Sequence, residues 1–194
     1  MTKTVQPDVQ LIRREEKAAR LSAFIQSSLV SAEAATLGAK PVEIVVVART
    51  GQSPVIHALT TALSASPGSN VRVSTILTDA NGEAGPDNVG ALGSIRLATD
   101  RNLREAHEQI VIGDQATWIG DCMRRDPTKL DAFERFVDEA EEVIAWARIA
   151  FDRLWAAAHP IRVIPASEHD GAATIDVASL PATSRPAGET PIRH

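Results

Sequence analysis

The stretch His107-Glu108-Gln109-Ile110-Val111-Ile112-Gly113-Asp114 constrains the fold more than any other part of the sequence. Successive side chains on a strand point to opposite faces, so His107 and Gln109 share one face while the isoleucines point to the other. Because isoleucine is apolar, we expect the isoleucine face of this strand to be buried in a core. The pattern therefore indicates a strand that holds a histidine beside an amide, with the carboxylate of Asp114 just beyond the strand end.

The segments around this strand predict a mixed sheet covered by helices. A second strand, Ala116 to Ile119, follows at once and is joined tightly around Asp114. Apolar runs rich in β-branched residues predict further strands, and apolar residues at steps of three and four predict helices. The strands are expected at Val42–Val47, Val71–Leu77 and Ser94–Ala98, and the helices at Gln10–Thr36, Pro54–Ser64 and Leu130–Ala158. Alternation early in the chain and adjacent strands later predict the α/β class.

The composition is that of a globular protein. The chain has 194 residues, 44% of them hydrophobic and 23% charged, with a formal net charge of −5. This acidic balance argues against a general nucleic-acid binder, although it leaves room for a local basic face. One cysteine, Cys122, excludes an internal disulfide and a cysteine-rich zinc site. With no apolar leader and no long apolar run, we predict a cytoplasmic protein.

The chain divides into three parts by composition. Residues 1–19 form a polar segment that includes the start of a helix, and residues 20–165 contain the periodic apolar pattern of a folded domain. Residues 166–194 are rich in Ala, Ser, Thr, Pro and Gly. Such a segment buries too little apolar surface to offset its ordering entropy, so we predict a disordered tail.

The motif resembles the signature of the phospholipase D superfamily, His-x-Lys-x4-Asp followed by a strand that ends in Gly-Ser-x-Asn. The likeness covers roughly residues 20–160 and corresponds to a single repeat of that fold. It also departs from the signature, because Gln109 stands at the lysine position. The second element reads Gly120-Asp121-Cys122-Met123, and it begins one residue early.

The resemblance implies a shared site in a homodimer. In the superfamily, two motif copies meet, one histidine attacks a phosphodiester and forms a phosphohistidine, and the other acts as general acid. A chain with one copy would dimerise to place His107 of each subunit near the axis, with Asp114 as the motif carboxylate. We predict no cofactor and no metal ion.

The departures from the signature predict a site that hydrolyses phosphodiesters poorly. Gln109 carries no charge with which to stabilise a phosphoryl transition state. At the serine and asparagine positions, Asp121 brings negative charge and Met123 lacks a useful donor. Arg124 and Arg125 follow at once and are the candidates for restoring positive charge.

Three functions follow from these observations. The leading prediction is a catalytically impaired module that binds a phosphate-bearing ligand or regulates a partner. The alternatives are an active phosphodiesterase of nuclease or phospholipase class that uses His107, and a structural scaffold whose long helix and tail recruit other chains. For single residues the alternatives are plainer: His107 as a hydrogen-bonded strand-end histidine, and Asp114 as a turn residue.

Overall fold

The computed structural model describes residues 8–36, 40–79, 92–99, 107–122, 131–138, 140–164 and 174–176. Eight strands form one sheet with the order β1-β7-β6-β5-β2-β3-β4-β8. The strands β2, β3 and β4 run parallel, and every other neighbouring pair is antiparallel. The predicted mixed sheet is therefore confirmed.

A βαβ unit forms the middle of the sheet. It consists of β2 (Val42–Ala48), α2 (Pro54–Ala65) and β3 (Val71–Leu77). Glu43 is the one exposed residue of β2, as expected for a parallel strand covered on both faces. Pro54 opens α2, because its fixed φ suits the first helical turn and its missing N–H has no intrahelical acceptor there.

The motif segment forms an antiparallel hairpin beside this unit. Its strands are β5 (His107–Ile112) and β6 (Ala116–Cys122), and β5 also pairs with β2. The ladder between β5 and β6 shifts register between His107 and Gln109. Both predicted strands are confirmed, and the bulge sets the histidine slightly apart from the regular strand that follows it.

The predicted helix Leu130–Ala158 is wrong in its first third. Residues Asp131–Asp138 form strand β7, and the helix α4 spans Glu141–Ala157. Phe133 and Val137 are four residues apart, a spacing that satisfies both the helical period and strand alternation. Pairing of β7 with β6 on one side and with β1 on the other decides in favour of the strand.

The N-terminal segment contains a strand that the sequence pattern did not indicate. Asp8–Arg13 forms β1 at the sheet edge, and α1 follows over Arg14–Thr36. The helix predicted from Gln10 therefore begins four residues later. Phe24 of α1 contacts Phe136 of β7 in an edge-to-face arrangement with ring centroids 5.2 Å apart.

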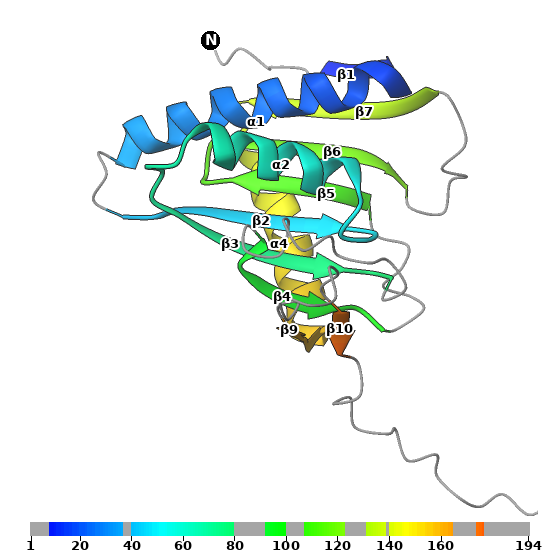
Figure 1. Cartoon of the computed structure of the whole chain (residues 1–194). Coiled ribbons are helices and arrows are strands. Elements are labelled where there is room, and N and C mark those ends of the chain that lie inside the picture. The colour runs from blue at the N-terminus through cyan, green and yellow to red at the C-terminus, as the bar shows by residue number, and fades with distance from the viewer. Residues whose placement is uncertain are drawn as a thin grey trace, which may run out of the picture.

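Helices cover the sheet on both faces. Figure 1 shows α1 and α2 on one face and α4 crossing the other. Each face has its own apolar core: Ile110, Ile112 and Trp118 lie with α1 and α2, whereas Val47, Val111 and Phe151 lie with α4. The alternation predicted for the motif strand is thereby confirmed, since its two faces enter the two separate cores.

The remaining described strands are short. β4 (Ser94–Leu97) pairs with β3 and with β8 (His159–Pro160), and β9 (Arg162–Ile164) pairs with β10 (Thr174–Asp176). The tail predicted from residue 166 lies outside the described residues except for β10.

Candidate functional site

The imidazole of His107 is held by a backbone carbonyl across the hairpin. Its Nδ1 lies 2.9 Å from the carbonyl oxygen of Gly120. A carbonyl oxygen can only accept a hydrogen bond, so Nδ1 carries the hydrogen. In the neutral ring, Nε2 therefore bears the lone pair, and the side chain is exposed. The ring thus presents Nε2 as a lone pair in its neutral form, as a nucleophile requires, and as an N–H donor in its protonated form, as an anion requires.

Trp118 requires a glycine at position 120. A Cβ atom at this position would lie 2.6 Å from Cη2 of Trp118, whose side chain is fully buried. The absence of a side chain lets the indole lie against the strand. Gly120 is the glycine that was placed at the Gly-Ser-x-Asn position by resemblance to the superfamily signature. The contact between the Gly120 carbonyl and His107 could have been found only from the pairing of the two strands.

Gln109 does not present its amide to solvent. The residue is 6% exposed, and its Nε2 donates a hydrogen bond of 3.2 Å to the carbonyl oxygen of Ala147 on α4. The amide thus joins the sheet to the helix that covers it. The side chain at the lysine position of the motif has a structural partner.

Asp114 lies at the opposite end of the hairpin from His107. It sits in the turn between β5 and β6, and its side chain is 94% exposed. The six residues of β5 separate it from His107 by about 20 Å, at roughly 3.3 Å per strand residue. The structure therefore does not bring these two predicted site residues together, and this geometry agrees with the turn interpretation of Asp114.

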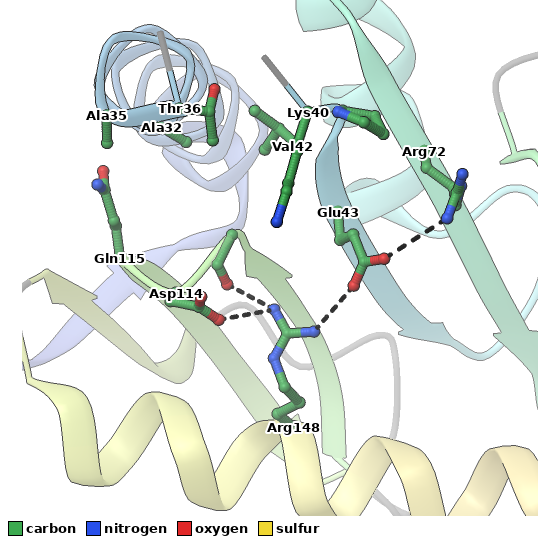
Figure 2. Close-up of a pocket in the computed structure, with 12 residues that line it drawn as sticks. Ala32, Ala35, Thr36, Lys40, Val42, Glu43, Arg72, Asp114, Gln115 and Arg148 are labelled. Carbon is green, nitrogen blue, oxygen red and sulfur yellow. Dashed lines mark hydrogen bonds and ion pairs between the residues drawn. The ribbon is translucent and has the colours of Figure 1, made fainter. Parts of the chain in front are cut away.

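The partner of Asp114 is Arg148 of α4. The guanidinium Nη2 lies 3.4 Å from Oδ1 of Asp114 and donates to the carbonyl oxygen of Gly113 at 2.7 Å. Its Nη1 lies 3.6 Å from Oε2 of Glu43, which also pairs with Arg72. Figure 2 shows Arg148 between the two carboxylates, with Lys40 reaching toward the same cavity of about 480 Å³. The ion pair with Asp114 and the hydrogen bond to Gly113 thus connect Arg148 of α4 to the turn.

A second cavity, of about 400 Å³, lies next to His107 on the α4 face of the sheet. We call it the α4 groove. His107 and Gln109 line it together with Ile119, Arg135, Val143, Trp146, Ala147, Ala150 and Leu154. Its walls are mostly apolar, and Arg135 of β7 is the residue there that sequence reasoning missed. Residues 130–138 were predicted to be helical. Only a strand at this position places the side chain of Arg135 on the α4 face of the sheet, so the prediction could not assign it to the groove.

The other predicted site residues lie at the limits of the described chain. Asp121 belongs to β6, where the structure describes its backbone, and Met123, Arg124 and Arg125 lie outside the described residues. In the ranges that are described, no group of His, Cys, Asp and Glu could hold a metal ion. Within those same ranges, no helix has the length and apolar character to span a membrane.

Comparison with solved structures finds proteins of similar fold. No protein-family model matches the sequence, and no curated protein matches it. NucT from Helicobacter pylori superposes with a TM-score of 0.50 at 12% identity, covering 80% of this chain and 99% of that chain. Nuc from Salmonella typhimurium, a phospholipase D family member, gives a TM-score of 0.48 at 14% identity, over 81% of this chain and 99% of that chain.

A third match differs in length. TrmBL2, an archaeal chromatin protein described as binding DNA in a novel mode, gives a TM-score of 0.47 at 12% identity. The match covers 82% of this chain, which spans 56% of TrmBL2. At these identities the likeness concerns the fold alone. The likeness to NucT agrees with the mixed α/β architecture of this chain.

Proposed function

We propose that this chain is a phospholipase-D-like module that binds a phosphate-bearing ligand at His107 without hydrolysing it efficiently. The observation that supports this most strongly is the position of Gln109. Its amide is buried and donates to Ala147 of α4, at the place where the superfamily signature puts a lysine. A phosphate beside His107 would therefore receive no charge from this position.

The missing charge matters more for catalysis than for binding. Negative charge accumulates on the phosphoryl oxygens as the transition state forms, and a fixed cation stabilises it there. Loss of one such donor typically costs about 10²–10³ in rate. A ground-state phosphate requires less, because a single oriented imidazole in its protonated form can donate a hydrogen bond to it from Nε2. A binding module is therefore what remains when the histidine is kept and the lysine is lost.

The geometry of His107 also favours the rival function. Because Nδ1 donates to the Gly120 carbonyl, the neutral ring has its lone pair on Nε2. A histidine nucleophile needs this neutral form. An active phosphodiesterase would then require a cation from elsewhere, and Arg124 and Arg125 are its candidates. Binding and turnover must therefore be measured separately.

Binding is tested by titrating the full chain with inorganic phosphate while the histidine ring resonances are followed by NMR. We expect saturable shifts at His107 with a Kd on the order of millimolar. His107→Ala should abolish the saturable component. The matched control is His57→Ala, since His57 is an exposed histidine of α2 whose Nε2 lies 3.1 Å from Gln52. Shifts of equal size at His57 and His107 would refute a specific site.

We further propose that two copies associate around His107, because one motif copy supplies one histidine and closed two-fold dimers are the commonest homo-oligomers. The chain has a mass of 20.7 kDa. Sedimentation at micromolar concentration should therefore give a species of about twice that mass. A lone monomer over the whole concentration range would refute the shared site and leave His107 to act within one chain.

A further inference from the structure

The α4 groove combines an apolar wall with a few polar side chains from the sheet. Helix α4 contributes Val143, Trp146, Ala147, Ala150 and Leu154, and the sheet contributes His107, Gln109, Ile119 and Arg135. Its volume of about 400 Å³ falls within the range of small-molecule sites, which is about 300–1,000 Å³. Such sites are typically apolar with a few placed polar groups, and this groove has that composition.

Trp146 lines the groove and is far more exposed than a core tryptophan. Its side chain is 69% exposed, whereas Trp118 is fully buried. On the same helix, Trp155 stacks on Phe151 with centroids 5.4 Å apart and also lies under the guanidinium of Arg96. An exposed indole beside a cavity offers a flat face on which an aromatic ligand can stack. Stacked aromatic pairs contribute more binding free energy than their buried area alone would give.

Arg135 brings positive charge into the same groove. It lies on β7 opposite Ile119 of β6, which in turn lies opposite Gln109 of β5, so the three form one row across the sheet. Among the atoms that the structure describes, its Nε is buried without a hydrogen-bond partner. A buried N–H of a charged group without a partner is costly. Arg135 as a whole is half-buried and lines the groove, so its positive charge lies beside any anion held there.

We propose that the α4 groove binds a small organic phosphate with a flat, aromatic body. The phosphate lies between Arg135 and His107, and the body stacks on Trp146. Arg135, rather than residue 109, then supplies the charge that holds the phosphate. This inference rests on the proposed function, because it assigns a ligand class and a second residue to the same site.

The test is calorimetric titration of the full chain with phenyl phosphate, inorganic phosphate, hexyl phosphate and benzyl alcohol. We expect phenyl phosphate to bind about tenfold more tightly than each of the other three probes, which corresponds to about 1.4 kcal/mol. Arg135→Met should remove this advantage over benzyl alcohol, and Arg135→Lys should keep part of it. Trp146→Ala should remove the advantage over inorganic phosphate. Arg72→Met is the matched control, because Arg72 is an exposed residue of β3 in the other cavity.

The outcomes separate this inference from the proposed function. Equal affinities for phenyl and inorganic phosphate, with His107 still required, would overturn the groove and leave phosphate binding in place. Equal affinities for phenyl and hexyl phosphate would overturn the aromatic preference. If none of the phosphates binds and Trp146→Glu converts a dimer into monomers in sedimentation, a second copy covers the groove and both proposals fail.

Discussion

Replacing Gln109 with lysine should destabilise the protein rather than repair its site. The position is 6% exposed, and the native amide donates to the carbonyl oxygen of Ala147. A lysine there would carry a charge into the space between β5 and α4, where no described carboxylate faces it. The free energy of unfolding should fall by about 3 kcal/mol, the lower end of what an uncompensated buried charge costs.

The matched control is Gln109→Met, which keeps the length of the side chain and removes the hydrogen bond. Its expected cost is about 1 kcal/mol, the net value of one buried hydrogen bond. Urea denaturation of both variants measures the difference. If the lysine variant is as stable as the methionine variant, position 109 reaches solvent, and the account of why this site lacks a cation is wrong.

The pH dependence of the lysine variant gives an independent check. Burial lowers the pKa of a lysine, so the unfolded chain would bind more protons at this residue than the folded protein does. Stability rises with pH wherever the unfolded state binds more protons. The deficit of Gln109→Lys relative to Gln109→Met should therefore shrink as the pH is raised. A deficit that is constant with pH would point to steric strain instead of charge.

Much of the fold could be predicted from local sequence because the central strands are short segments rich in β-branched residues. Val42–Val47 and Val71–Leu77 are too short and too β-branched for helices, and Pro54 marks the start of the helix between them. The alternation after His107 also placed its two faces correctly. In each case the residues that decide the structure lie within a few positions of one another.

The edge of the sheet could not be predicted because its cause is not local. β1 and β7 pair residue 8 with residue 136, across most of the chain. Apolar residues four apart, such as Phe133 and Val137, fit a helix and a strand equally well. Tertiary pairing decides between them, and without it Arg135 could not be placed in the groove.

The candidate site was predictable in part for a related reason. His107 and Gln109 were recognised by their shared face, and both line the α4 groove. Asp114 was grouped with His107 by motif spacing, whereas the strand between them places it at the other end of the hairpin with Arg148. The group that holds the imidazole is the carbonyl of Gly120. Backbone groups carry no sequence signal, so only the strand pairing reveals that contact.

The central claim is that the site around His107 binds phosphate but lacks the motif lysine, whose place Gln109 takes, and therefore hydrolyses a phosphodiester poorly. Each missing donor should cost about 10²–10³ in rate, and a two-fold dimer would miss the lysine twice. We therefore expect the rate of phosphodiester hydrolysis with the protein to equal, within error, the rate in buffer alone, even though the imidazole is oriented for attack.

The most direct measurement is hydrolysis of bis(4-nitrophenyl) phosphate by the wild-type chain and by His107→Ala, with His57→Ala as the histidine control. The account predicts that all three proteins give the same rate, indistinguishable from buffer. Robust wild-type turnover that persists in His57→Ala and disappears in His107→Ala would contradict it, and would establish the chain as an active phosphodiesterase.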